Sequence, residues 1–415
     1  MKKNIKTWGN ISGKSVFLIN NISDTNEPLI AFGNRNSYGD APVSASSTSF
    51  NLITNIDSKH NPNQTISDFV NSNKKILFGI PGKNNVTLAG ATASDTHGKD
   101  NVWGGSFIKN IEGITLITAS GKEINATRDK NNEIFYSTIG GYGLTGIISD
   151  IRFRENEIPF SEVFFTEVNF GNGIKNLINS FESAKNEYWV GWVDLVGKKN
   201  NWYIEKSVSK NSQIINNKIP KKDKNLNLRL SFIGTNSFNT MKIVNQIYFL
   251  SKKISFQKNK KFDDVFYPLG NISDTRNFAK KRKIIQVQFS IPVKNENKIQ
   301  HLINLLTEEQ TPILCSVKRI TSNESKLNFS FTQDGWTFAV DFPYETFNEK
   351  SIRRFYQELI RQEGKIYLAK DISLNEEEFK SMYSNYKEWS EVVKEVDPGK
   401  KFQSEMSVRL GMKKW

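Results

Sequence analysis

The sequence has 415 residues, of which 37% are hydrophobic and 12% aromatic, a composition typical of a folded protein with two or three domains. Its formal net charge is +14 at pH 7, and it contains a single cysteine and three histidines. One cysteine excludes an internal disulfide framework and a cysteine-based metal cluster, and the histidines lack the spacing of a metal-binding motif. We therefore expect no metal site.

The positive charge could serve several kinds of partner. Its densest lysine runs, Lys218 to Lys224, Lys258 to Lys261 and Lys280 to Lys283, are separated from one another, and no helix-turn-helix, zinc-finger or RNP-like motif accompanies them. We do not expect nucleic acid as a partner, whereas an anionic substrate or an acidic membrane surface fits the charge equally well. The sequence contains no signal-peptide core and no stretch of ~18 apolar residues, so we expect a cytoplasmic protein or one at the membrane periphery.

Residues 1–155 consist of short apolar runs between turns rich in Gly, Asn, Ser and Thr, which predicts short strands joined by irregular loops: SVFLI, PLIAFG, KILFGIPG, GITLITASG and IISDIRF. Gly141, Gly143 and Gly146 spell the GxGxxG pattern of dinucleotide-binding proteins, in which a helix must begin inside the motif. Here residues 147–153 alternate between apolar and polar instead. The glycines are therefore expected in a turn that enters a strand, without a Rossmann site.

From residue 162 onward the sequence predicts an antiparallel sheet with helices on one side. Residues 162–206 read as strand, helix, strand and strand, and 284–293 alternate cleanly as a further strand. A helix at 296–310, a strand at 311–320, a hairpin at 326–343, an amphipathic helix ending at Gly364 and a strand at 365–371 follow, which is a split βαβ layout. The last segment, NEEEFKSMYSNYKEWSEVVKEVDP, is expected to be helical.

Two segments of the N-terminal part have the composition of ligand-binding loops. FGNRNSYGDA, Phe32 to Ala41, offers many free amides and one guanidinium, which suits a pyrophosphate; an ordinary Asn/Gly turn is the alternative. Ile80 to Lys99 is dominated by small residues from Thr87 to Ser94, which a backbone packed closely against a flat ligand would explain. His97 follows in a polar stretch and is either structural or catalytic.

A third candidate is GKIYLAKD, which contains Tyr367 and Lys370. In a regular strand these side chains would point to opposite faces, unless the strand ends and bends near Ala369. A lysine at a strand end beside a cleft can act as a base or bind an anion, and a solvated surface lysine is the alternative.

Taken together, FGNRNSYGD, PGKNNVTLAGATASDTHGK and GGYGLTGII resemble, in order and spacing, the vanillyl-alcohol-oxidase/PCMH-type FAD-binding superfamily. More narrowly, they resemble its decaprenylphosphoryl-β-D-ribose 2′-oxidase family, and the similarity continues through QVQFSIP, SVKRI, DGWTFAVDFP, IYLAKD and VDPGKKFQSEMSVRL. The resemblance implies an α+β fold in which a PCMH-type FAD-binding domain is joined to a substrate domain built on an antiparallel sheet covered by helices. The corresponding boundaries are 1–157 for the first part of the FAD-binding domain, 158–365 for the substrate domain and 366–415 for the C-terminal return to the FAD-binding domain.

The resemblance also implies roles for individual residues. Lys370 would be catalytic, with His97 as the second candidate, and Gln286, Gln288, Lys318 and Tyr267 would bind the substrate. FAD would be bound by Ala31, Phe32, Gly33, Asn34, Arg35, Asn36, Ser37, Tyr38, Gly39, Asp40, Ala41, Gly82, Thr87, Leu88, Ala89, Gly90, Ser94, Asp95, Thr96, His97, Ile148 and Tyr367.

The chain departs from these relatives at three places. Asn36 and Ser37 stand where covalent flavoproteins have a histidine, so FAD is expected to be non-covalent. Ala339 replaces a cysteine near the flavin, and the stretch 52–80 is shorter than in the relatives.

The implied reaction is oxidation of the C2′ hydroxyl of a polyprenylphosphoryl-ribose to the 2′-keto sugar, the first half of an epimerisation to arabinose for the cell envelope. A short-chain reductase would be the partner, and peripheral membrane contact is expected. The alternatives are an FAD-dependent oxidase of a soluble sugar or alditol on the same fold, and a flavin-free binding protein.

Overall fold

The computed structural model describes residues 2–19, 21–46, 48–51, 61–155, 158, 160–181, 186–210, 238–254, 259–268, 283–322, 324 and 326–415. The basic run Lys218 to Lys224, together with Lys258 and residues 280–282 of the other two runs, lies outside these residues, as does 52–60 of the shortened stretch.

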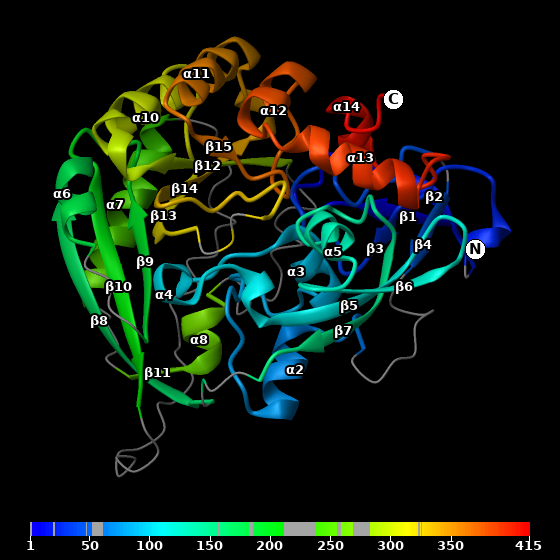
Figure 1. The fold of residues 1–415 in the computed structure, drawn as a ribbon. Coiled ribbons are helices and arrows are strands. Elements are labelled where there is room, and N and C mark those ends of the chain that lie inside the picture. The colour runs from blue at the N-terminus through cyan, green and yellow to red at the C-terminus, as the bar shows by residue number, and fades with distance from the viewer. Residues whose placement is uncertain are drawn as a thin grey trace.

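The described residues combine helices with a large antiparallel sheet, in agreement with the predicted α+β class (Figure 1). Among the described residues it has eight strands in the order β11-β8-β10-β9-β13-β14-β12-β15. Their bounds are β8 Val163–Asn172, β9 Glu187–Val193, β10 Asn201–Ser209, β11 Asn259–Lys261, β12 Ile284–Pro292, β13 Leu314–Ile320, β14 Gly335–Pro343 and β15 Lys365–Ile366. The segments 162–206 and 284–320 thus join one sheet, as the sequence predicted.

The alternation of residues in β12 sets the two faces of this sheet. Phe289 pairs with Phe338 of β14, and their rings stack with centroids 5.3 Å apart in the main hydrophobic core. Gln286 and Gln288, one position before Val287 and Phe289, face the other way. One face of the sheet is therefore a dry core, and the other carries polar side chains.

Helices cover the sheet on both faces, which corrects the expectation of helices on one side only. α6 (Ile174–Asn179), α10 (Ile299–Thr307) and α11 (Glu349–Arg361) contribute to the main core. α7 (Phe238–Ile254) packs on the opposite face, where Phe249 clusters with Trp192 and Tyr203. Tyr203 alternates with Trp202 and Ile204, which point into the main core, so β10 is apolar on both faces and can bury both.

The N-terminal part contains two smaller sheets, ordered β1-β2-β4-β3 and β6-β5-β7 (Figure 1). The strands are β1 Lys2–Lys6, β2 Gly13–Ile19, β3 Ala31–Phe32, β4 Thr48–Asn51, β5 Ile111–Ile117, β6 Glu123–Thr127 and β7 Ile147–Phe153. Between them lie the helices α2 Ile66–Asn73, α3 Leu88–Ser94, α4 Asn101–Gly104 and α5 Asn132–Thr138. The turn GGYGLTG leads into β7 without a helix, as predicted.

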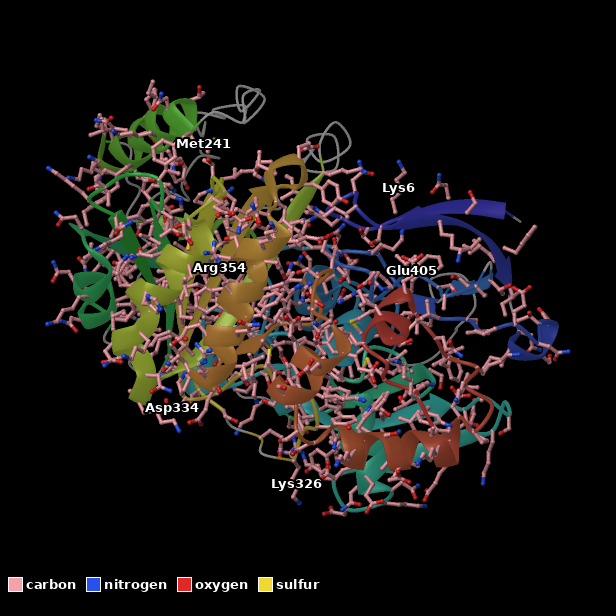
Figure 2. The ribbon with its side chains drawn as sticks, turned by 90° about the horizontal axis from the view of Figure 1, so that it is seen from above. Lys6, Met241, Lys326, Asp334, Arg354 and Glu405 are labelled. Carbon is pink, nitrogen blue, oxygen red and sulfur yellow. The ribbon has the colours of Figure 1, made fainter. Side chains whose placement is uncertain are left out.

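The remaining helices are α8 (Phe262–Phe266), α12 (Glu376–Met382), α13 (Tyr386–Val396) and α14 (Glu405–Arg409). The C-terminal segment returns to the N-terminal part, where Leu29 forms a bridge with Phe402 and Ser44 with Ser404. Figure 2 shows Glu405 of α14 beside the N-terminal strands.

Two predicted strands are absent. Residues 75–82 form no strand because side chains bind the backbone of this segment: Phe78 exchanges hydrogen bonds with the Asn110 side chain, and the Gly79 N–H donates to Asp100. The hairpin at 326–343 was also wrong, since 326–332 is irregular. Both edges of β14 are already paired, with β12 and with β13, and no edge remains for a third partner.

Candidate active site

A cavity of about 490 Å³ opens where the polar face of the large sheet meets the loops of the N-terminal part. Most of the residues predicted to bind cofactor or substrate line it, although they come from segments far apart in the sequence. They are Ala31, Phe32, Gly33, Asn34, Arg35, Asn36, Ser37, Tyr38, Ala41, Gly82, Thr87, Gly90, Ser94, Thr96, His97, Gln286, Gln288, Lys318, Tyr367 and Lys370.

The loop after β3 is fixed against the loop before α3. The side-chain amides of Asn34 and Asn36 donate to the carbonyl of Asn85 at 2.8 and 3.0 Å. Gly33 packs so closely that a Cβ there would lie 2.4 Å from Thr87 Oγ1. Within the described part of the chain, the backbone N–H groups of Asn34 and Asn36 have no protein acceptor. The backbone N–H groups of Asn34 and Asn36 are therefore available to a ligand in the cavity that these residues line. Their side chains hold the shape of the loop.

The small residues from Thr87 to Ser94 form helix α3, an element that the sequence analysis did not predict. Thr87 caps it by accepting the Gly90 N–H at 3.1 Å. The GGYGLTG turn packs on the end of this helix, where the Tyr142 N–H donates to the Ala93 carbonyl at 2.8 Å and Tyr142 reaches the cavity wall. Small side chains allow this close approach of turn and helix.

His97 is the centre of the polar end of the cavity and is only 6% exposed. Its Nε2 lies 2.9 Å from the Gln288 amide, and its Nδ1 lies 3.1 Å from Lys318 Nζ, which also donates to the His97 carbonyl. Burial, with the nearby charges of Lys318 and Lys370, holds the pKa of His97 well below its usual value. The imidazole is therefore neutral at neutral pH.

Tyr367 and Lys370 both reach the cavity because the strand ends early. β15 stops at Ile366 and a turn follows, in which the Lys370 N–H donates to the Tyr367 carbonyl at 2.9 Å. The Tyr367 hydroxyl donates to the Ser94 carbonyl at 2.9 Å, and its ring meets His97 edge-on. Lys370 Nζ lies 4.1 Å from the centre of the Tyr38 ring. The bend that the sequence left open is thus present, slightly earlier than Ala369.

The lysines and carboxylates of this end have pKa values close to neutrality. Burial lowers the pKa of Lys370 to about 8, against the opposing effect of Asp341, and lowers that of Lys318 to about 7. Burial raises the pKa of Asp341 to about 7, although the hydrogen bond from Gln286 (2.7 Å) and the charge of Lys370 favour its ionised form. Groups of this kind can exchange protons near physiological pH.

Some of the predicted residues do not line the cavity but lie behind the residues that do. Leu88, Ala89, Ile148 and Tyr267 are buried in a second hydrophobic cluster, separate from the main core and built mostly from the N-terminal part. Asp95 accepts the Ile108 N–H at 3.0 Å.

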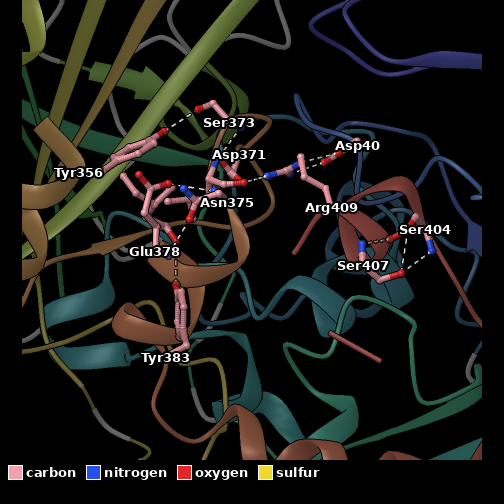
Figure 3. A network of polar contacts seen from close by, with 12 residues as sticks. Asp40, Tyr356, Asp371, Ser373, Asn375, Glu378, Tyr383, Ser404, Ser407 and Arg409 are labelled. Carbon is pink, nitrogen blue, oxygen red and sulfur yellow. Dashed lines mark hydrogen bonds and ion pairs between the residues drawn. The ribbon is translucent and has the colours of Figure 1, made fainter. Parts of the chain in front are cut away.

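Asp40 also lies behind the wall, in a network of ion pairs (Figure 3). It pairs with Arg409 of α14, which binds Asp371 through its other nitrogen at 2.8 Å. A Cβ on Gly39 would lie 1.9 Å from the Asp371 carbonyl, so only glycine fits between the two segments. These residues join the loop 33–41 to the C-terminal segment.

Several cavity residues were missed by the sequence analysis. Trp8 lines the cavity with a buried indole Nε1 that has no partner in the described part of the chain. Tyr203 and Glu205 alternate in β10, and this period-2 pattern was a signal that could have assigned both to one face. Nothing in the local sequence pointed to Trp8.

Comparisons with known proteins identify the family of the chain. Residues 167–410, more than half of the chain, match the D-arabinono-1,4-lactone oxidase family. Over 347 residues the chain is 24% identical to decaprenylphosphoryl-beta-D-ribose oxidase of Mycolicibacterium smegmatis, covering 80% of this chain and 75% of that protein.

A shorter match, 37% identical over 68 residues, is to an uncharacterized protein in the mprA 5′ region of Streptomyces coelicolor, and covers 16% of this chain and 18% of that protein. In the described residues no helix is both long and apolar enough to cross a membrane. The chain belongs to the D-arabinono-1,4-lactone oxidase family and is an FAD-dependent oxidoreductase that acts on a hydroxyl group.

Proposed function

We propose that the protein oxidises the C2′ hydroxyl of a polyprenylphosphoryl-ribose to the 2′-keto sugar, the first half of an epimerisation to the arabinose configuration. The observation that carries this proposal is the two-ended cavity. His97, Gln288, Lys318 and Lys370 form a polar end, while Trp192, Tyr203, Ile313 and Leu314 form an apolar end in the same cavity. A free sugar needs only the polar end, whereas a sugar joined to a lipid chain uses the polar end and the apolar end.

The loops of the N-terminal part fit FAD in the arrangement of a PCMH-type FAD-binding domain, made of residues 1–157 and 366–415. Among the described residues, the backbone N–H groups of Asn34 and Asn36 have no protein acceptor, and a Cβ on Gly82 would meet no atom within 4 Å. These features leave donors and space for a diphosphate and a ring system. We propose that FAD is held there non-covalently, since Asn36 and Ser37 stand where covalent flavoproteins have a histidine; acid precipitation should release it from the protein.

When bound, FAD supplies the hydride acceptor. The protein must take the hydroxyl proton as the hydride leaves, and we assign this task to Lys370, whose pKa of about 8 leaves part of it neutral at physiological pH. His97 has both ring nitrogens next to Gln288 and Lys318. Its role would be to hold these two side chains against the sugar hydroxyls.

The polar floor would orient the sugar through hydrogen bonds. Gln286, held by Asp341, and Gln288, which also donates to Thr337 at 3.2 Å, lie on the same face of β12 two residues apart. Such fixed amides keep the reacting carbon in one position, which lowers the entropic part of the barrier.

The proposal has two further parts. The protein makes a peripheral contact with an anionic membrane, and a partner short-chain reductase would reduce the ketone to the opposite epimer. The membrane contact is supported by α7, whose outer side exposes Ile243, Ile247, Leu250 and Ile254 and whose Lys252 lies at the cavity. Sedimentation with anionic vesicles measures this contact, and Ile247→Glu should weaken it.

The second candidate is oxidation of a soluble sugar, alditol or aldonolactone, which the name of the family favours. Both candidates are tested by adding substrate to the purified yellow protein without oxygen and following the flavin absorbance. We expect bleaching by a polyprenylphosphoryl-ribose at micromolar concentration and none by arabinono-1,4-lactone or free alditols. Bleaching by the soluble compounds alone would replace the first candidate with the second.

A further inference from the structure

Of the described residues that line the cavity near β10 and α7, Lys99 and Lys252 are positive and Glu205 is negative. Glu205 of β10 has Lys252 Nζ at 3.3 Å and Lys260 Nζ at 3.0 Å from the same carboxylate oxygen. Lys99 interacts with the same carboxylate, and its ammonium donates to the Val265 carbonyl. Among the described residues, the Glu205 carboxylate therefore faces several ammonium groups.

These groups are partly buried, and three of them line the cavity. Lys99, Glu205 and Lys252 line it, and the side chains of Glu205 and Lys252 are 12% and 33% exposed. Lys252 Nζ lies 5.5 Å from the ring centre of Tyr203 and 5.8 Å from that of Tyr248. Lys252 is thus bordered by aromatic rings.

The neighbouring lysines keep Glu205 ionised. Burial alone would raise the pKa of Glu205, but Lys260, Lys252 and Lys99 outweigh it and lower the pKa to about 2. Burial, with Lys260 and Lys252, lowers the pKa of Lys99 to about 8 in spite of Glu205. Partly buried lysines are stabilised by a bound group of opposite charge, and an anion from the ligand can supply it.

The lysines also lie next to the residues that would bind the sugar. Lys99 follows His97 by two residues, so the cationic wall adjoins the polar end where the sugar would be oxidised. In a polyprenylphosphoryl-ribose the phosphate is on the carbon next to the one that is oxidised, and the lipid begins on the other side of the phosphate. A substrate of this kind needs an anion site between a polar and an apolar end.

We propose that Lys99 and Lys252, held by Glu205, form a subsite for the phosphate of a lipid phosphate, with the rings of Trp192, Tyr203 and Tyr248 in contact with the first units of the chain. This inference rests on the proposed function, which it deepens by assigning the part of the site that recognises the phosphate. Charge-assisted bonds to phosphate favour the ionised lysines, and salt weakens them.

The test uses the FAD-loaded protein and isothermal titration calorimetry with farnesyl phosphate, farnesol and inorganic phosphate. Farnesyl phosphate should bind at least tenfold more tightly than farnesol, and Lys252→Ala should remove most of this preference. Lys252→Arg should keep it. Lys253→Ala is the matched control, because Lys253 follows on the same helix, lies over Phe170 and Phe249, and is absent from the cavity wall.

Three results would overturn the inference: equal affinity for farnesyl phosphate and farnesol, equal effects of Lys252→Ala and Lys253→Ala, or inorganic phosphate binding as tightly as farnesyl phosphate. The last would leave no role for the lipid. Because these are binding measurements, they separate the inference from the proposed reaction. A protein that binds farnesyl phosphate through Lys252 but oxidises only soluble sugars would keep the subsite and lose the proposed substrate.

Discussion

Two buried polar clusters in this protein combine basic side chains with carboxylates but differ in how the charges are paired. Around Arg409, each nitrogen of the guanidinium faces a carboxylate, from Asp40 and from Asp371, and the pKa of Arg409 is raised by Asp371 and Asp40 despite its burial (Figure 3). Around His97, Lys318 and Lys370 form no ion pair with a carboxylate of the described residues, and burial lowers the pKa of Lys370 to about 8. Where opposite charges are matched in contact, the groups stay ionised and join segments; where they are not, the groups titrate near neutrality and become available for proton transfer.

The largest effect should come from Lys370→Ala, which removes the proposed proton acceptor. We expect turnover of the substrate to fall by about 10²- to 10⁴-fold, the usual contribution of a general base. Because Lys370 contributes only part of the cavity wall, FAD should remain bound, as measured by the absorbance of the purified variant. Turnover within a fewfold of the unmodified protein would remove Lys370 from the mechanism.

Arg409→Ala breaks the matched cluster and leaves two buried carboxylates without their positively charged partner. The Asp371 side chain is fully buried, so the free energy of unfolding should fall by about 3–5 kcal/mol. Urea unfolding followed by tryptophan fluorescence measures this. The control is Arg361→Ala, since Arg361 pairs with Glu358 but is 70% exposed and should contribute less than about 1 kcal/mol. Equal losses in the two variants would contradict the structural role of Arg409.

The pH dependence of kcat/KM should reveal the titrating cluster. A base must be neutral to accept a proton, and burial lowers the pKa of Lys370 to about 8. The rate should therefore rise with pH and level off above about pH 8, falling about tenfold per unit well below the pKa. In Lys370→Ala the residual rate should lose this limb. A profile that is flat from pH 6 to pH 9 would speak against a lysine base.

The smallest effect is expected from Ala339→Cys, which adds a thiol to the cavity wall without adding a charge. Turnover should change by less than about twofold, because the proton-transfer groups are untouched and the volume added is small. The variant should, however, become sensitive to thiol reagents, whereas the protein with alanine should not. Mass spectrometry of the labelled protein locates the modification.

Strong local patterns determined much of the fold. The alternation in β8, β10 and β12 and the amphipathic spacing of α11 predicted these elements, because burial of one face imposes the period. The same reasoning failed at 75–82, where backbone groups bond to Asn110 and Asp100 from distant positions, and at 326–332, where β14 has no free edge. A local pattern carries no information about partners that arrive from elsewhere in the chain.

The candidate site divides in the same way. By itself, the sequence predicted that the loop 33–41, the segment 87–97 and the pair Tyr367 and Lys370 contribute to a ligand site, because free amides, small residues and a lysine at a strand end suit one and because these motifs resemble an FAD-binding family. Only the tertiary structure decided that Asp40 supports the wall through Arg409 and that Lys99, Glu205 and Lys252 share a surface. Proximity and burial set the pKa of each group, and both exist only once the chain is folded.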